Sequence, residues 1–125
     1  MLEPVQNELL TVGAMISAAG PENTPGVSLD PTAVTRLEAQ IDEICGRLPE
    51  LKHLLVPGGC ELACRLHVAR TACRAAERRL AAALASETRI APTIMPYLNR
   101  LSDLMFALAR QANHAAGVTE SVWEH

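Results

Sequence analysis

The sequence has few aromatic residues, almost no lysine and no long apolar run. Its 125 residues include one Trp, one Tyr and one Phe, and a single Lys stands beside ten Arg. Scarce aromatics and abundant Ala and Leu favour closely packed helices over a β-sandwich or barrel, because sheets are rich in aromatic and β-branched side chains. No apolar stretch approaches the ~20 residues that a membrane-spanning helix needs. These absences favour an all-α fold without a membrane partner.

Charge, the first residues and cysteine content argue against a nucleic-acid-binding, membrane-bound or secreted protein. The formal net charge of -3 is a mild acid excess, which provides no general attraction to nucleic acid or to an anionic membrane. The first residues lack the basic and then apolar pattern of a secretory signal, so a cytoplasmic location is expected. The four cysteines are then expected to be free thiols. At this length we expect residues 1–125 to form one domain.

Apolar residues recur at steps of three and four in four stretches, which predicts four amphipathic helices. The expected helices cover about 2–19, 31–48, 60–86 and the stretch from Pro96 to a stop at Gly117, and 20–26 is expected to be a surface loop. Together they predict an antiparallel helical bundle. The residues expected on the buried faces include Leu2, Val5, Leu9, Val12 and Ile16; Leu62, Leu66, Ala69, Cys73, Ala76 and Leu80; and Tyr97, Leu101, Leu104, Leu108 and Ala115.

A polar stripe lies beside the apolar face of the third predicted helix. It consists of His67, Arg70, Arg74, Glu77 and Arg78. Such a row of arginines suits phosphates or carboxylates, because the guanidinium group forms forked, charge-assisted hydrogen bonds. The alternative is that Arg74, Glu77 and Arg78 form ordinary ion pairs on a helix surface. Periodicity alone leaves both interpretations open.

Two other features stand near this helix. The connector before it, residues 49–59, is unusually apolar, so we expect a partner, a ligand or the core to cover it. Cys60, Cys64 and His67 share one face of the helix and are a candidate metal site. A Cys-x3-Cys spacing is not usual for zinc and no fourth ligand is evident, so this site is the weaker hypothesis.

Four blocks of the sequence, in the right order, resemble one family. They are Val5 to Leu9 with Gly13, Leu51 to Gly59 ending in Val-Pro-Gly-Gly, His67 to Arg78, and Leu98 to Arg110 followed by Asn113. In these blocks the chain is similar to the corrinoid adenosyltransferases whose relatives serve propanediol utilisation and human methylmalonate metabolism. The blocks extend from near residue 2 almost to the end of the chain.

The resemblance implies both an architecture and a reaction. Members of the family are five-helix bundles, of which the four helices expected here are the greater part, and they form homotrimers with active sites between subunits. They transfer the 5′-deoxyadenosyl group of ATP, with Mg²⁺, to the cobalt of cob(I)alamin or another Co(I) corrinoid and release triphosphate. The alternative is a degenerate, non-catalytic protein that binds corrinoid or joins trimers as an interaction subunit.

The resemblance also implies site residues. Those on the ATP side are Arg74, Glu77, Arg78 and Asn99, and Arg70 corresponds to an arginine that pairs with an aspartate of the adjoining subunit. Those on the corrinoid side are Leu54, Leu55, Asp103 and Phe106.

Three departures from the family pattern bear on activity. The family's Thr-, Gly- and Asp-rich phosphate-binding segment precedes the position that Met1 occupies, so the chain is expected to be truncated relative to the family. Leu54 stands where the family usually has Phe, and Ala75 replaces the second of two adjacent arginines. Because part of a preorganised anion site is missing, we expect the 125-residue chain alone to be weakly active or inactive.

Overall fold

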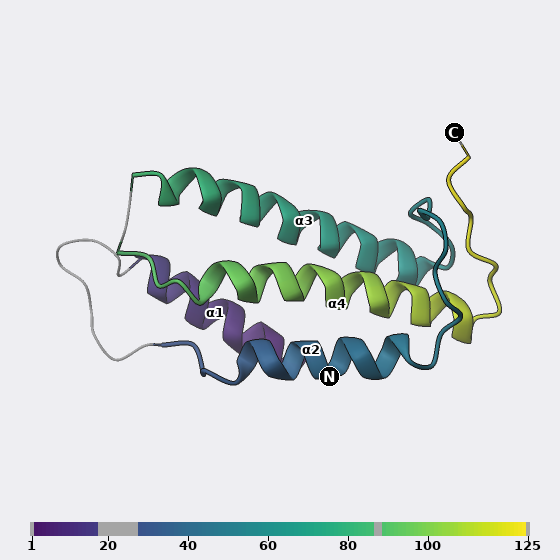
Figure 1. The fold of residues 1–125 in the computed structure, drawn as a ribbon, viewed down its shortest axis with the longest axis horizontal. Helices are drawn as coiled ribbons and strands as arrows, with labels where there is room; N and C mark the ends of the chain where they lie inside the picture. The colour runs from purple at the N-terminus through teal and green to yellow at the C-terminus, as the bar shows by residue number, and fades with distance from the viewer. Residues whose placement is uncertain (1, 18–27, 87–88, 125) are drawn as a thin grey trace.

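The computed structural model describes residues 2–17, 28–86 and 89–124, and its architecture is a bundle of helices (Figure 1). Consecutive helices run in opposite directions, which confirms the predicted all-α antiparallel bundle. The expected loop at 20–26 lies outside the described residues. The helices are α1 (Glu3–Ser17), α2 (Ala33–Cys45), α3 (Glu61–Leu84) and α4 (Ile94–Ala115).

Helix α4 is the centre of the bundle. It packs against both α3 and α2, which lie on opposite sides of it in Figure 1. Tyr97, Leu101 and Leu104 of α4 are at most 1% exposed, and Leu37 of α2 is fully buried against this core. Burial therefore extends around most of the circumference of α4, whereas each of the other helices buries one side.

The two ends of α4 follow from local chemistry. The helix begins at Ile94, before the expected start at Pro96. Pro96 lies in the first turn, where its lack of an N–H costs no hydrogen bond, because the first N–H groups of a helix have no acceptor within the helix. At the other end, Gly117 adopts a φ of 69°. The Val118 N–H donates to the carbonyl of Asn113 at 2.9 Å, and the Gly117 N–H donates to that of His114 at 3.2 Å. This Schellman arrangement confirms the predicted stop at Gly117.

Helices α2 and α3 are shorter than their apolar patterns indicate. Helix α2 begins at Ala33 rather than at Pro31, because the Asp30 carboxylate accepts the Thr32 N–H at 2.8 Å and forms a turn before the helix. It ends at Cys45, three residues before Leu48. Helix α3 has Cys60 as its N-cap and ends at Leu84, inside the expected range of 60–86.

Several residues expected on buried faces are exposed. On α3, Leu62 is 59% exposed and Ala76 is also exposed, whereas Leu66 and Leu80 are buried as expected. The physical reason is a rotation of the contact face, since Ala63, Leu66 and His67 form the buried part of the first half of α3. The predictions were also wrong for the residues that lie beyond the contact faces of α1 and α4, namely Leu2, Leu9, Ile16 and Ala115, which are exposed.

The connector between α2 and α3 meets the C-terminal segment at one end of the bundle (Figure 1). Leu55 and Val122 form an isolated antiparallel bridge. The Val56 N–H donates to the Ser121 carbonyl at 2.8 Å, and the Trp123 N–H donates to the Leu54 carbonyl at 2.7 Å. The connector is only partly covered by this pairing, because Leu54 remains 68% exposed.

No helix in the described ranges is long and apolar enough to cross a membrane. All four cysteines, Cys45, Cys60, Cys64 and Cys73, are free thiols.

Candidate functional site

A cavity of about 400 Å³ lies between α3, α4 and the connector. It brings together all four residues expected on the corrinoid side and two of the arginines from the polar stripe. Leu51 and Ser102, which are not among the site residues expected from the sequence, also line it. The lining residues are Leu51, Leu54, Leu55, Arg70, Arg74, Ser102, Asp103 and Phe106.

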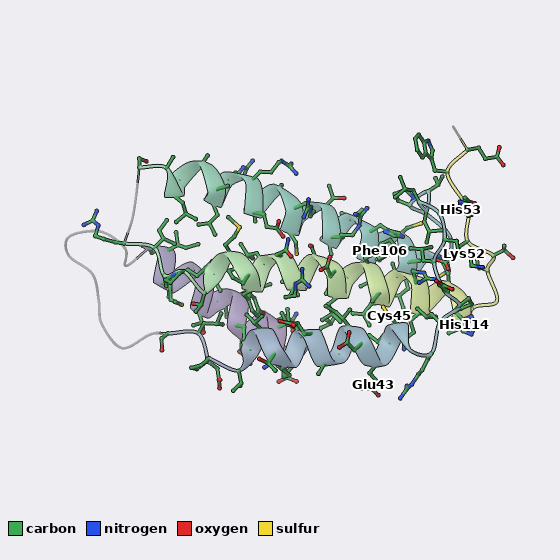
Figure 2. The ribbon with its side chains drawn as sticks, in the orientation of Figure 1. Glu43, Cys45, Lys52, His53, Phe106 and His114 are labelled. Carbon is green, nitrogen blue, oxygen red and sulfur yellow. The ribbon has the colours of Figure 1, made fainter. Side chains whose placement is uncertain are left out.

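Helical spacing explains this convergence. Arg70 and Arg74 are four residues apart on α3, while Asp103 and Phe106 are three apart on α4, so each pair lies on one face of its helix. Phe106 is labelled in Figure 2, where α3 and α4 lie side by side. The guanidinium carbon of Arg70 lies 5.6 Å from the centre of the Phe106 ring, a cation–π contact across the two helices.

Glu77 connects the two helices at the ATP-side residues. Its Oε2 accepts hydrogen bonds from Arg74 Nη1 at 3.2 Å and from Asn99 Nδ2 at 3.4 Å. Its Oε1 accepts from Ser102 Oγ at 3.5 Å. The Arg74–Glu77 ion pair is the helix-surface pair that the sequence left open, but the Arg74 side chain remains 52% exposed and lines the cavity. Arg78 is also exposed but does not line the cavity.

The remaining charges near the cavity differ in how far they are compensated. Asp103 forms an ion pair with Arg100 at 3.1 Å. Within the described part of the chain, the Nε atom of Arg70 is buried and has no hydrogen-bond partner. Burial and the nearby Glu77 carboxylate raise the pKa of the Cys73 thiol. Cys73 is therefore a packing residue rather than a reactive thiolate.

A smaller cavity of about 170 Å³ adjoins the larger one. Leu55 lines both, and His67 lines the smaller cavity while its ring meets Phe106 edge to face at 6.1 Å. Burial and the charge of Arg70 lower the pKa of His67, against an opposing effect of Glu120. The imidazole is therefore neutral at pH 7.

Two residues of α4 hold the connector and the C-terminal segment over these cavities. Asn113 Nδ2 donates to the Gly58 carbonyl at 2.9 Å, and Asn113 Oδ1 accepts the Cys60 N–H at 2.9 Å. Arg110 Nη2 donates to the Pro49 carbonyl at 2.9 Å, and its Nε lies 3.2 Å from both oxygens of Glu120. Both anchors are buried, with 6% of Arg110 and 3% of Asn113 exposed.

The candidate cysteine–histidine metal site is wrong. No group of three or more His, Cys, Asp or Glu side chains among the described residues is placed to hold a metal ion. Cys64 is exposed and its Sγ lies 3.6 Å from the Gly59 carbonyl, whereas His67 is buried against Phe106. A shared face in the sequence did not bring these side chains together, because the bundle buries one and exposes the other.

Sequence reasoning missed the part that the C-terminal segment plays. Residues 118–121 line the smaller cavity, and the next two pair with the connector. No local pattern marks this segment, because it acquires its place by pairing with a connector more than 60 residues earlier in the chain. The anchors Arg110 and Asn113 carried a usable signal, since they continue the face of α4 that holds Asn99, Asp103 and Phe106.

Residues 1–112 match the family described as cobalamin adenosyltransferase. The chain belongs to this family. It is 39% identical over 117 residues to the corrinoid adenosyltransferase PduO of Citrobacter freundii, with 93% of this chain and 35% of that protein covered. It is also 39% identical over 120 residues to the corrinoid adenosyltransferase of Bacillus subtilis, with 96% of this chain and 61% of that protein covered. This family member thus spans less than two thirds of the length of these curated relatives.

Solved structures share its fold. A variant of the PduO-type ATP:corrinoid adenosyltransferase of Lactobacillus reuteri, complexed with cobalamin and ATP, superposes with a TM-score of 0.92 at 31% identity. The comparison covers 99% of this chain and 68% of that one. A second variant of that enzyme, complexed with ATP, gives a TM-score of 0.89 at 30% identity, with 98% of this chain and 68% of that one covered.

Proposed function

We propose that this chain binds ATP and a Co(I) corrinoid and catalyses transfer of the 5′-deoxyadenosyl group to cobalt. The observation that carries the proposal is the cavity of about 400 Å³, which brings two arginines to an apolar wall of the connector. Similarity to an adenosyltransferase that was complexed with cobalamin and ATP supports the same assignment. In this reaction cobalt forms a bond to C5′ with its own electron pair, the C5′–O bond breaks, and triphosphate leaves with the electrons of that bond.

On the ATP side, the proposed residues act by position and charge. Glu77 fixes Arg74 and Asn99 relative to each other, so less side-chain entropy is lost when they meet the nucleotide. Arg74 and Arg78 retain exposed guanidinium groups that suit phosphate oxygens. We propose that Mg²⁺ arrives with ATP and is bound mainly by the triphosphate, as is usual for this small, strongly hydrated cation.

On the corrinoid side, the wall of the cavity is apolar. Leu54, Leu55 and Phe106 line it, and the exposed connector gains a cover when a flat, largely apolar ring lies against it. Excluding water strengthens the electrostatic contacts around the reacting atoms and protects the strongly reducing Co(I) from side reactions. Leu54 offers less flat contact area than an aromatic side chain at this position.

A homotrimer is part of the proposal. It rests on the family resemblance, which implies that Arg70 lies at a subunit boundary, and the Arg70 side chain is only partly buried in the single chain. Leu10, Leu62 and Val68 are each more than half exposed and offer apolar contact area. Light scattering after size-exclusion chromatography should give three times the 13.4 kDa of the chain, and a monomer at all concentrations would contradict this assembly.

We also propose that residues 1–125 act as one domain and work in the cytoplasm, where ATP is available. The non-catalytic alternative has no observation in its favour, since the relatives described above are all named as adenosyltransferases.

The test is anaerobic incubation of the chain with Co(I) corrinoid and Mg-ATP, followed by spectroscopy for a light-sensitive adenosylated product. Arg74→Ala should lower the rate about 100-fold, because it removes a preorganised charge from the site. Arg79→Ala is the matched control, since Arg79 is exposed on the same helix and does not line the cavity. EDTA should stop the reaction if Mg²⁺ accompanies ATP.

The outcomes separate the two functions. Product formation that depends on Arg74 but not on Arg79 supports catalysis. Corrinoid binding without ATP binding and without product would instead favour the non-catalytic alternative, and absence of both binding and product would refute the proposed function.

A further inference from the structure

The smaller cavity lies directly beside the proposed corrinoid site but has a different chemical character. Leu55 lines both cavities, and the His67 ring contacts Phe106 of the larger one. The larger cavity has apolar walls and two arginines, whereas the smaller one combines apolar residues of the connector with uncharged polar residues and has Glu120 as its carboxylate. No lysine or arginine is among the described residues that line it.

Two of its side chains determine what kind of group fits. His67 is 7% exposed and is held neutral by burial, and its Nδ1 has no hydrogen-bond partner in the described ranges. Glu120 lines the cavity and is held by its ion pair with the buried Arg110, and no other acidic residue is among the described lining residues. Asn113 is already used, because its amide bonds the Gly58 carbonyl and the Cys60 N–H. The cavity thus offers hydrogen-bond capacity, and the cations near it, Arg110 beside Glu120 and Arg70 beside His67, lie outside its lining.

The size of the cavity restricts the guest to a small group. One water occupies ~30 Å³ of liquid volume, so about 170 Å³ holds a group of a few heavy atoms together with one or two waters. A carboxamide has this size, donates two hydrogen bonds to a carboxylate or carbonyl, and accepts others through its oxygen. A carboxylate of the same size is only an acceptor and meets Glu120 as a like charge.

We propose that the smaller cavity is a subsite for one carboxamide arm at the edge of the corrin ring, and that Glu120 makes the site select amidated over carboxylated corrinoids. This inference rests on the proposed function, because it assumes that the ring occupies the larger cavity. The arm reaches past Leu55, and its NH₂ group donates to Glu120. A corrinoid that carries a carboxylate on this arm binds poorly, since its charge lies beside that of Glu120.

The experiment compares cobinamide with its singly hydrolysed derivatives, in each of which one carboxamide arm has become a carboxylate. Trp123 is the only tryptophan of the chain and its backbone is bonded to the connector, so quenching of its fluorescence reports binding. One derivative should bind the wild-type chain about ten-fold more weakly than cobinamide, and the others about as well. Glu120→Gln should remove most of this difference, because a Gln keeps a hydrogen bond to Arg110 without the charge.

Glu124→Gln is the matched control, since Glu124 is exposed in the same segment and does not line the cavity. It should keep the ten-fold discrimination. Equal binding of all the derivatives to the wild-type chain, which requires no variant to fold, would overturn the subsite alone. A discrimination that Glu120→Gln leaves unchanged would overturn the role of Glu120. Failure of cobinamide itself to bind would overturn the proposed function and the subsite with it.

Discussion

Asn113 lies so close to Gly59 that no side chain fits between them. A Cβ atom at Gly59 would overlap the oxygen, nitrogen and carbon atoms of the Asn113 amide group. Gly59 also adopts a φ of 112°, which L-residues with a side chain rarely adopt. The backbone of the connector at Gly59 therefore packs directly against the Asn113 side chain of α4, and this contact requires a glycine at position 59.

Replacing this glycine should destabilise the protein. Gly59→Ala is expected to lower the free energy of unfolding by about 2 kcal/mol, through backbone strain and displacement of Asn113. Gly13→Ala is the control, because Gly13 lies within α1 and a methyl group there would meet nothing within 4 Å; it should raise stability by about 0.5–1 kcal/mol. Urea unfolding followed by circular dichroism measures both. Equal stability of Gly59→Ala and wild type would show that the connector does not need this contact.

The rotation of α3 predicts unequal effects for two leucines that the sequence treats alike. Leu66 is 8% exposed, and Leu66→Ala should cost about 2–4 kcal/mol of unfolding free energy through lost burial and a cavity. Leu62 is 59% exposed, and Leu62→Ala should change stability by less than about 0.5 kcal/mol. Thermal unfolding at low protein concentration tests the pair. A larger loss of unfolding free energy for Leu62→Ala than for Leu66→Ala would show that Leu62 is on the buried face of α3, as periodicity predicted.

Glu77 should matter for both stability and nucleotide binding. Glu77→Ala leaves the Asn99 amide and the Ser102 hydroxyl without their partner, and should cost about 1–3 kcal/mol. It should also weaken ATP binding, because Arg74 loses the contact that orients it. Glu61→Ala is the matched control, since its ion pair with Arg65 is exposed and should contribute less than about 0.5 kcal/mol. If the two variants have the same free energy of unfolding, Glu77 acts as a surface residue and does not connect α3 to α4.

The contact between Glu8 and Tyr97 predicts the acid limb of the stability profile. Burial alone would raise the pKa of Glu8, but hydrogen bonds from Arg36 and Tyr97 outweigh it and lower this pKa below its ordinary value. The unfolded state then binds more protons than the folded state at acid pH. Stability should be full above about pH 4.5 and decline as the pH falls through the lowered value. Glu8→Gln should make this decline shallower, as urea midpoints between pH 2 and 7 would show.

The same contact acts in the opposite direction at high pH. Burial and the Glu8 carboxylate raise the pKa of Tyr97, so the folded state keeps a proton that the unfolded state loses near pH 10. Stability is present below about pH 10 and should fall above it. Tyr97→Phe should flatten this alkaline limb and cost about 1 kcal/mol at neutral pH through the lost hydrogen bond to Glu8. An alkaline limb unchanged in Tyr97→Phe would place the titration elsewhere.

Sequence by itself determined the class of fold and indicated residues of the candidate site. Apolar steps of three and four, together with scarce aromatics, are local properties, and they predicted the helices and their order. The polar stripe of α3 was also readable, because helical spacing places such residues on one side of a helix, whereas Asn99, Asp103 and Phe106 came from the family resemblance. Arg70 and Arg74 of this stripe meet Asp103 and Phe106 in one cavity because α3 and α4 pack antiparallel.

Only the tertiary structure decided how the helices rotate and what covers their ends. Periodicity gives a broad apolar face, but the neighbouring helix selects the part that is buried, which is why Leu66 is covered and Leu62 is not. The bridge between Leu55 and Val122 and the anchors from Arg110 and Asn113 join residues that are more than 50 positions apart. Such contacts form only when the packed helices have already overcome the entropy of closing the intervening chain, so no local pattern specifies them.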